Sequence, residues 1–520
     1  MKQKLPIGIA SFADIRQNNY IYIDKTPHIS NLINGKFYFL SRPRRFGKSL
    51  LIDTLKQAFS GNKQLFNGLY LEDNWDWSVS YPIIHLDFGG SSSLNSEQVL
   101  LGIILSKLRH IAKTYQVQLQ ENYQIGQILE NLIWDLYNKY QQKIVLLIDE
   151  YDKPILDCIT DTQQAVKMRE ILKQLYSVIK ANDNYLKFVF ITGVSKFSKV
   201  SLFSGLNNLN DISLDGKYAD ICGYTQNELE ANFADYLIAG NVDKLELKKW
   251  YNGYNFAGIE TQKVYNPFDI LLFFEKNYEY TNYWFETATP TFLIELIKAK
   301  QYFIPELENL VVPSSSINSF EVEDIQLITL LFQSGYLTIK QVIHDIDGRS
   351  YQLTYPNFEV KLSLNQYLAN LGSNRNSFFS HKPQLRKSLI NNQFDSLIEI
   401  FSSHFASIPH DWYRNNNIAN YEGFYASVVY SYFTALGYDL VAEDATNYGR
   451  IDLSITMPDK MLLIEFKLST NGDAKSALAQ IKAKNYAQKY IIENKPIYAI
   501  GMSFDPINRN VVDLVSEQIN

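Results

Sequence analysis

The sequence predicts an α/β protein of more than one domain, with a parallel sheet in its N-terminal part and a smaller α/β domain at its C-terminus. A short apolar run, 37–40, leads through a glycine-containing loop into an amphipathic stretch, 50–59, the pattern of strand, loop and helix. A second apolar run, 143–150, ends in two carboxylates, and two β-type runs, 449–455 and 462–468, flank a turn signal. With 520 residues, the chain exceeds the roughly 250–300 residues at which one core stops growing.

The composition indicates a folded chain without a strong charge bias. Hydrophobic residues make up 46% and charged residues 20%, as in globular proteins. The formal net charge of −6 excludes an overall basic field, so any contact with nucleic acid must be local. The two cysteines, Cys158 and Cys222, have no metal-ligand spacing and favour a reducing, cytoplasmic location. No apolar run approaches the roughly 18 residues of a membrane span, so we expect no membrane partner.

The loop after the first strand ends in Gly47-Lys48-Ser49, the second half of the phosphate-loop pattern. In that pattern, backbone N–H groups at a helix start hold phosphate oxygens, the lysine adds positive charge and the hydroxyl ligates magnesium. The pattern is incomplete, because Arg42 occupies the position of its first glycine and Pro43 supplies no N–H donor. By itself, the tripeptide is equally consistent with an ordinary helix start that carries a lysine.

The run 143–150 strengthens the phosphate-loop interpretation. Its five consecutive apolar residues predict a parallel strand buried on both faces, with Asp149 and Glu150 at its carboxyl end. Ligand sites of such sheets lie at these strand ends. In phosphate-loop enzymes an aspartate there holds magnesium and a neighbouring glutamate can orient or deprotonate water, so we assign Asp149 and Glu150 to these roles. The alternative is an ordinary solvent-exposed strand end.

Two further apolar runs, 82–87 and 186–193, fit the same sheet. Helical segments separate them from the other strands, and this alternation predicts a parallel α/β sheet. Thr192 lies at the end of the second run, where a polar side chain can sense the terminal phosphate. A threonine at a strand end is more often a turn residue, and this alternative remains open.

The predicted C-terminal hairpin brings two acids and a lysine together. If its turn centres on Pro458 and Asp459, paired positions add up to 917, and Asp452 lies opposite Glu465. Opposed side chains on one face lie about 5 Å apart at Cβ, so the two carboxylates can share a divalent cation. Lys467 lies two residues beyond Glu465 and therefore on the same face. The alternative is an exposed Glu465–Lys467 ion pair on a surface hairpin.

Two predicted helices flank the hairpin in sequence. Glu422 lies near the start of a helical run that continues to 430. Apolar residues recur with helical spacing between 474 and 481, and Gln480 lies beside that face. The C-terminal quarter thus has the order helix, strand, hairpin, helix, strand.

Seven motifs occur in order through the first 300 residues: YIYIDKT (20–26), FLSRPRRFGKSLL (39–51), IDEYDKP (148–154), ITGVSKFS (191–198), WYNGYNF (250–256), VYNPFDIL (264–271) and YWFETATPTFL (283–293). They resemble the bacterial AAA-ATPase-like family, whose members typically carry a C-terminal PD-(D/E)XK nuclease domain. The resemblance implies an AAA-like P-loop ATPase core with a helical lid, which binds ATP through Gly47, Lys48 and Ser49 and magnesium through Ser49 and Asp149. Arg44 and Arg45 can contact phosphate or an acidic partner, although solvated arginines are the more ordinary interpretation.

Residues 412–516 resemble the PD-(D/E)XK superfamily, with its restriction-endonuclease-like α/β fold. The resemblance implies that Glu422, Asp452 and Glu465 place Mg²⁺, or Mn²⁺, at a nuclease site. It also implies that Lys467 orients water or stabilises the charge on phosphorus, and that Gln480 supports the site. The bond hydrolysed is then a phosphodiester, in DNA more than in RNA.

Four segments are expected. They are an ATPase core (1–220), a helical lid (221–300), a connector or small winged-helix-like module (301–390) and a nuclease-like domain (391–520). The aromatic motif at 250–256 either stacks bases or forms a small core.

Two functions from different classes follow. The first is an ATP-binding protein, an ATPase, coupled to a metal-dependent nuclease that acts on nucleic acid. The second is a nucleotide-dependent switch whose nuclease-like domain recognises its partner without cutting. An ATP-driven motor ranks last, because no helicase motif set is recognisable. A homo-oligomer is compatible with either function.

Overall fold

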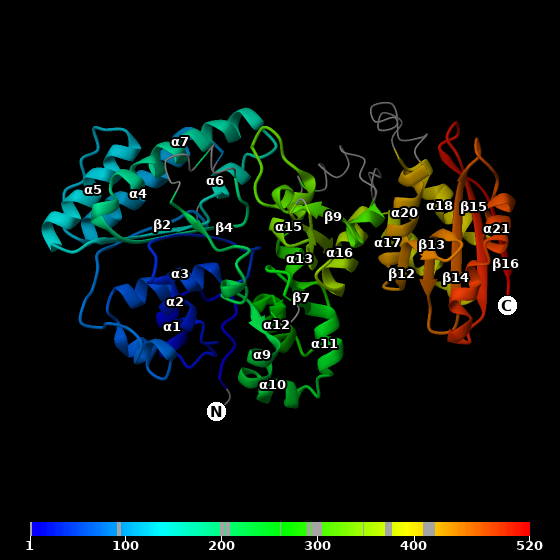
Figure 1. Cartoon of the computed structure of the whole chain (residues 1–520), viewed down its shortest axis with the longest axis horizontal. Coiled ribbons are helices and arrows are strands. Elements are labelled where there is room, and N and C mark those ends of the chain that lie inside the picture. Colours follow the sequence, from blue (N-terminus) through cyan, green and yellow to red (C-terminus); the bar gives the residue numbers. More distant parts are fainter. Residues whose placement is uncertain are drawn as a thin grey trace. The chain divides into compact units, whose positions relative to one another are not determined.

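The chain folds into two compact units, described by a computed structural model for residues 3–90, 95–197, 202, 208–259, 262–288, 293, 304–346, 348–369, 377–408 and 422–520. Unit 1 comprises residues 1–288 and 311–357, and unit 2 comprises 289–310 and 358–520 (Figure 1). The segment expected to be one connector, 301–390, is therefore divided between the two units. Within these described ranges, no helix is long and apolar enough to span a bilayer.

Unit 1 is built on a five-stranded sheet that is parallel throughout, in the order β2-β3-β4-β1-β5. Its strands are β1 (Phe37–Ser41), β2 (Ile83–Asp87), β3 (Ile144–Asp149), β4 (Leu186–Gly193) and β5 (Asn210–Asp211). Every side chain of β1 and β3 is buried, as expected for strands covered on both faces. The four strands predicted from the sequence are confirmed, and their carboxyl ends meet at one edge of the sheet.

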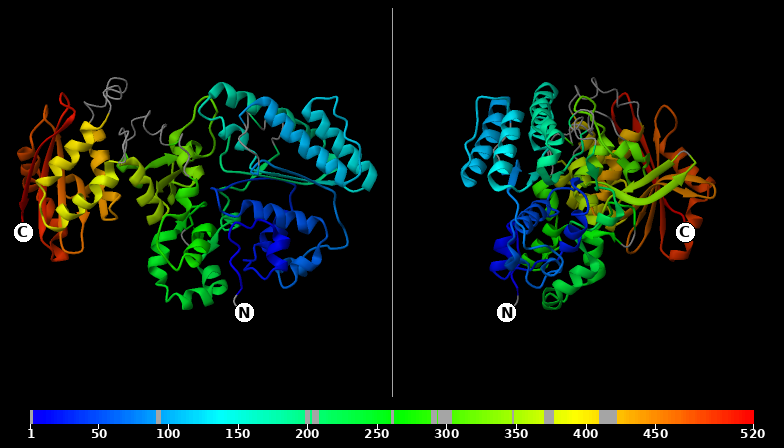
Figure 2. Two further views of the ribbon diagram at one scale, coloured as in Figure 1. Left: turned by 180° about the vertical axis from the view of Figure 1, so that it is seen from behind. Right: turned by 60° about the vertical axis from the view of Figure 1, so that its left-hand side comes forward.

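Helices cover both faces of this sheet, as Figures 1 and 2 show. One face carries α4 (Glu97–Thr114), α5 (Ile125–Tyr140) and α7 (Thr162–Ala181), and the other carries α1 (Phe12–Gln17), α2 (Thr26–Leu32) and α3 (Lys48–Phe59). Side-chain caps fix where the long helices begin. Ser96 accepts a hydrogen bond from the Val99 N–H at the start of α4, and Asp161 accepts one from the Gln164 N–H at the start of α7.

A mostly helical region follows the sheet in unit 1. Its elements are β6 (Tyr224–Thr225), α9 (Gln226–Asn232), α10 (Ala234–Ala239), α11 (Lys244–Tyr251), β7 (Asn252–Tyr254), β8 (Val264–Tyr265), α12 (Pro267–Glu275) and α13 (Tyr283–Ala288). Tyr251 and Tyr254 are fully buried, Phe256 is 6% exposed, and Trp250 packs against a core cluster of this region. These aromatic side chains form a core, so the base-stacking alternative for them is wrong.

Residues 311–357 complete unit 1. They form β9 (Val311–Pro313), α15 (Leu327–Ser334), β10 (Thr338–Asp345) and β11 (Gly348–Thr354), with the strands in the antiparallel order β10-β11-β9. The segment is tied to the region before it, because the Asn255 N–H donates to Thr338 Oγ1 at 2.7 Å and the Ile339 N–H donates to the Asn255 carbonyl at 3.3 Å.

Unit 2 contains a five-stranded mixed sheet in the order β12-β13-β14-β15-β16, in which β14 and β15 are parallel and the other pairs are antiparallel. Its strands are β12 (Asp439–Thr446), β13 (Gly449–Thr456), β14 (Met461–Leu468), β15 (Ile497–Asp505) and β16 (Asn510–Gln518). Its helices include η6 (Ile304–Glu308), α16 (Phe358–Leu368), α17 (Ser377–Ile390), α18 (Ser396–Ala406), α20 (Glu422–Thr434) and α21 (Ala474–Ala483).

The predicted register of the hairpin is confirmed. Leu453 pairs with Ile464 and Thr456 with Met461, and in both pairs the positions add up to 917. Helix α21 packs on β14 and β15, while α18 and α20 also pack on the sheet. The order helix, strand, hairpin, helix, strand is therefore present.

Candidate functional site

The phosphate loop joins β1 to α3 in unit 1. Gly47 is the N-cap of α3 with φ of 92°, a left-handed conformation that glycine adopts without strain, and Lys48 is the first helical residue. Lys48 is 5% exposed, and its ammonium donates hydrogen bonds to the carbonyls of Arg42 (2.9 Å) and Pro43 (3.0 Å). One of its three donors remains for a further acceptor at the start of the helix, beside half-buried Ser49.

Arg42 organises the loop from inside. Its guanidinium donates to the carbonyls of Ser41 (2.9 Å), Ser213 (2.7 Å) and Tyr218 (3.0 Å) and lies 4.0 Å from the centroid of the Phe256 ring. Burial lowers the pKa of Arg42 to about 10. In the sequence, Arg42 stood out only because it occupies the position of the first glycine of the phosphate-loop pattern. Two of its partners, Ser213 and Tyr218, lie more than 170 residues away, and no local pattern identifies them.

Replacing Arg42 with Met is expected to destabilise unit 1 by about 2–4 kcal/mol, because buried carbonyls then lose their donors. Urea unfolding measures the change. Arg45→Met is the matched control, since the Arg45 side chain is exposed, and its effect should stay within about 0.5 kcal/mol. Equal stability of the two variants would contradict the structural role of Arg42.

Arg44 and Arg45 are exposed in the loop. The carbonyl of Arg44 accepts a hydrogen bond from the indole of Trp284 at 3.1 Å. Arg45 has a φ of 69°, and its guanidinium lies 4.9 Å from the centroid of the Phe268 ring. The positive charge of Arg44 lies near enough to Glu150 to counteract the rise in that residue's pKa.

The acidic edge of the sheet contains the residues predicted for magnesium and water. Asp149 is 2% exposed, and its Oδ1 accepts hydrogen bonds from Thr192 Oγ1 (2.5 Å) and the Glu150 N–H (3.0 Å). Because β4 lies between β3 and β1, Thr192 stands between Asp149 and the phosphate loop. Burial raises the pKa of Glu150, and the charge of Lys48 opposes this rise.

Asp87 and Gly89 lie at the same edge and were not predicted as site residues. Asp87 pairs in register with Asp149, and its Oδ1 accepts the Gly89 N–H at 2.7 Å. A Cβ at Gly89 would lie 2.8 Å from Glu150 Oε2, so glycine leaves room for that carboxylate. The predicted strand 82–87 already ended in Asp87, and the shared edge of a parallel sheet was the signal that could have found it.

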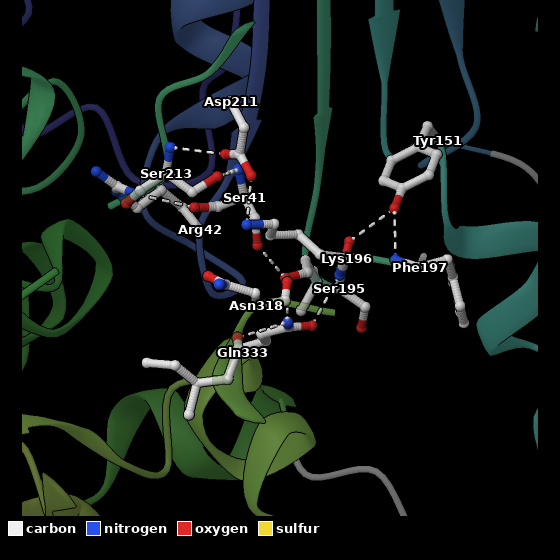
Figure 3. A network of polar contacts seen from close by, with 12 residues as sticks. Ser41, Arg42, Tyr151, Ser195, Lys196, Phe197, Asp211, Ser213, Asn318 and Gln333 are labelled. Carbon is white, nitrogen blue, oxygen red and sulfur yellow. Dashed lines mark hydrogen bonds and ion pairs between the residues drawn. The ribbon is translucent and has the colours of Figure 1, made fainter. Parts of the chain in front are cut away.

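The backbone after β4 is held by a polar network, drawn in Figure 3. The buried Asp152 carboxylate accepts the Ser195 N–H at 2.6 Å, and Tyr151 contacts the same loop through its hydroxyl, which donates to the Ser195 carbonyl at 3.0 Å. Gln333 of α15 accepts the Lys196 N–H at 2.7 Å, and the Lys196 ammonium pairs with Asp211. The loop that follows Thr192 is therefore fixed to the residues just after β3, to β5 and to α15.

In unit 2, the candidate site forms where β13 leaves β14. Backbone pairing of these strands covers 453–456 and 461–464, so the N–H groups further along β14 that point away from β15 need other acceptors. Asp452 Oδ2 accepts the Phe466 N–H at 2.6 Å, and Glu422 Oε2, at the start of α20, accepts the Leu468 N–H at 3.1 Å. Two carboxylates are thereby aligned along one strand.

Glu465, Lys467 and Gln480 meet beside these carboxylates. Glu465 is 2% exposed, its Oε1 lies 3.3 Å from the Lys467 ammonium, and its Oε1 also accepts a hydrogen bond from Gln480 of α21. Its Oε2 accepts the Asp452 N–H at 3.4 Å. The structure thus brings all five residues predicted for this site into one connected group.

Buried negative charge, only partly balanced by Lys467, marks this group. Burial, and then the charge of Glu465, raise the pKa of Asp452 to about 7, and burial also raises the pKa of Glu465. A divalent cation would relieve this repulsion, and carboxylate oxygens are the ligands that Mg²⁺ prefers, so the donor set fits such a cation. Across the described ranges, no three His, Cys, Asp or Glu side chains converge closely enough to enclose a metal ion. The contacts of Glu465 with Lys467 and Gln480 hold it in place.

A pocket of about 130 Å³ opens beside the carboxylates. Glu422 and Asp452 line it, together with Pro305 of η6, Tyr430 of α20 and Glu443 of β12. Segment 304–308 is held against α20, because the Ile304 N–H donates to Ser427 Oγ at 3.2 Å. Room for substrate atoms therefore exists next to the acids.

The chain was compared with known proteins. The profile of the family described as "Predicted AAA-ATPase" matches residues 6–203, and that described as "PD-(D/E)XK nuclease superfamily" matches residues 420–514. Among solved structures, the Aeropyrum pernix ORC1 protein in complex with DNA is similar over 66% of this chain and 91% of that chain, at 10% identity and a TM-score of 0.27. That likeness is too low to support an argument.

One curated relative matches from end to end. It is described as "Uncharacterized protein in vnfD 5'region" of Azotobacter chroococcum mcd 1, and it is 46% identical over 521 residues, which cover 100% of this chain and 99% of that protein. This chain therefore belongs to the family of proteins that join a predicted AAA-ATPase domain to a C-terminal PD-(D/E)XK nuclease superfamily domain.

Proposed function

We propose that this protein binds and hydrolyses ATP at the phosphate loop and hydrolyses phosphodiester bonds of nucleic acid, DNA rather than RNA, at its C-terminal site. The observation that carries the nuclease assignment is the pair of buried carboxylates, Asp452 and Glu465, beside the Lys467 ammonium. Burial raises the pKa of both carboxyls, the charge of Glu465 raises that of Asp452 further, and a bound cation would favour the charged form of each.

At the ATP site, each residue has a role that its contacts support. The free N–H groups at the start of α3 and the third donor of Lys48 face phosphate oxygens. Ser49 and Asp149 would hold Mg²⁺, and Thr192 fixes the Asp149 carboxylate. Glu150, with its raised pKa, is suited to take a proton from water. The pocket beside Gly47 that Tyr22, Phe46 and Leu50 line offers an apolar wall to the base.

At the nuclease-type site, Asp452 and Glu465 would hold the cation, and Glu422, which lines the same pocket as Asp452, would lie beside it. When bound, it lowers the pKa of water and stabilises charge on the scissile phosphate. Gln480 orients Glu465, and the Lys467 ammonium, 22% exposed, can reach both that carboxylate and a phosphate oxygen.

The test is cleavage of single- and double-stranded DNA and RNA with Mg²⁺ or Mn²⁺, with and without ATP. We expect the cleavage rate of Glu465→Ala to be lower than that of wild type by about 100-fold or more, since a metal ligand is removed. Cleavage by Lys48→Ala should no longer depend on ATP. Glu493→Ala, a 36% exposed acid elsewhere in unit 2, is the control and should cleave normally. Cleavage that survives in Glu465→Ala would show that the activity arises elsewhere.

A second candidate function has a specific observation in its favour. Because Glu465 is engaged by Lys467 and Gln480, unit 2 can recognise nucleic acid without cutting it, under the control of bound nucleotide. Binding of nucleic acid that depends on ATP, with no cleavage under either metal, would select this function. Sedimentation in the same buffers tests the proposal of a homo-oligomer.

A further inference from the structure

Positive charge is concentrated in one stretch of unit 2. Although the whole chain carries 49 basic and 55 acidic side chains, residues 360–394 include no Asp or Glu. The stretch has five basic residues, Lys361, Arg375, Lys382, Arg386 and Lys387. Lys361 is neutralised by Glu308 at 2.7 Å, and Arg375 lies outside the described residues. The remaining three lie on α17.

These three side chains share a surface groove. Lys382, Arg386 and Lys387 line a hollow of about 540 Å³, whose other lining residues are Pro383, Ile390 and Asn391. Within the described part of the chain, no Asp or Glu forms an ion pair with any of the three basic residues. Arg386 donates one long hydrogen bond, 3.5 Å, to the Leu436 carbonyl. Burial, and then the neighbouring charge of Arg386, lower the pKa of Lys382. The groove therefore presents cationic groups without an anionic partner.

The groove is anchored to the strand that carries the candidate site. The buried Lys460 ammonium donates to the carbonyls of Leu389 and Ile390, both at 3.0 Å, at the end of α17. Lys460 directly precedes β14, and Glu465 lies five residues further on. At about 3.3 Å per residue, Lys460 itself lies roughly 17 Å from Glu465 along the strand.

We propose that this groove binds the phosphodiester backbone of the nucleic acid held at the C-terminal site. The inference rests on the proposed function, and it identifies the surface that supplies affinity for the nucleic-acid substrate. Residues 411–520 contain 13 acidic and 10 basic side chains, so their composition has no excess of positive charge. In duplex DNA the charges of one strand recur about every 3.4 Å along the helix axis, so a duplex must extend over roughly five base pairs or more to reach both places.

The test compares wild type with a triple variant, Lys382→Gln, Arg386→Gln and Lys387→Gln. Fluorescence anisotropy in EDTA measures binding of labelled DNA of about 2 and about 20 nucleotides at several salt concentrations. For the longer DNA, we expect affinity to fall about tenfold or more, and the slope of log K against log salt to become shallower by about 2–3. Binding of the shorter DNA should not change.

Two controls accompany the triple variant. Lys63→Gln, Lys107→Gln and Lys113→Gln together remove the same charge from unit 1 and should leave binding unchanged. Lys382→Arg, Arg386→Lys and Lys387→Arg together keep the charge and should bind as wild type does. Thermal unfolding of each variant shows whether the fold is intact.

The outcomes separate this inference from the function on which it rests. If wild type binds neither length of DNA, the proposed function and the groove fall together. If wild type binds and the triple variant binds equally well, the groove alone is overturned. Polyglutamate is the comparison probe. If the triple variant lost binding of polyglutamate while its DNA binding was unchanged, the groove would be assigned to an acidic protein instead. This outcome would also overturn the proposal.

Discussion

Asp452→Asn is expected to abolish tight Mn²⁺ binding at the C-terminal site and, in metal-free protein, to make unit 2 more stable at pH 8. A unit charge 4 Å from another contributes about 4 kcal/mol near a protein surface, so loss of the carboxylate should weaken Mn²⁺ binding about 100-fold or more. Calorimetric titration with Mn²⁺ measures this affinity.

The effect on stability follows from the raised pKa of Asp452, which moves from 3.8 to about 7. Between these values the folded state binds more protons than the unfolded state, so wild type loses stability as pH rises through this window. In EDTA, the urea concentration at the unfolding midpoint of wild type should therefore decrease as pH rises from 5 to 8. That of Asp452→Asn should change less, and its stability at pH 8 should exceed that of wild type by about 1–3 kcal/mol.

Asp459→Asn is the control for both measurements. It removes a carboxylate from the turn of the same hairpin, where the side chain is 65% exposed. We expect Mn²⁺ affinity and pH dependence like those of wild type. If Asp452→Asn bound Mn²⁺ with the affinity of wild type, Asp452 would not be a ligand of the cation.

Lys48→Ala is expected to weaken ATP binding about 100-fold, because about 3 kcal/mol of charge-assisted hydrogen bonding to phosphate is lost. Equilibrium binding of ATP, with Mg²⁺ and with EDTA, measures the loss. Ser49→Ala should weaken binding in Mg²⁺ and leave binding in EDTA almost unchanged, since its hydroxyl is assigned to the metal.

Lys63→Ala serves as the control for Lys48→Ala, because Lys63 is exposed and lies outside the phosphate loop. Because Lys48 also binds two loop carbonyls, urea unfolding must show that Lys48→Ala remains folded. A folded Lys48→Ala protein with wild-type ATP affinity would show that the loop is not the nucleotide site.

The sequence predicted those parts of the fold that short-range patterns specify. The turn at Pro458 and Asp459 fixed the register of β13 with β14, because a short turn leaves little freedom in pairing. The buried run ending at Asp149 identified a central strand, because only a strand covered on both faces is apolar throughout. The meeting of Asp452, Glu465 and Lys467 followed from these local rules.

Contacts between distant segments could not be predicted in this way. Arg42 binds the carbonyls of Ser213 and Tyr218, and Asp152 binds the backbone after β4. These hydrogen bonds depend on which loops the fold brings together. No periodicity or spacing in the sequence indicates which loops will meet. The division of 301–390 between the two units was missed for the same reason.

The path of the chain between the units limits how this protein can be divided or recombined. Segment 289–310 belongs to unit 2, the chain then returns to unit 1 for 311–357, and it enters unit 2 again at 358. A gene fragment beginning at 358 would lack Glu308, which contacts Tyr430 and Lys361. No single cut yields both units whole, so a recombination event with one junction leaves at least one unit incomplete. The two units should therefore be inherited as one piece, in keeping with a relative that matches 100% of the chain.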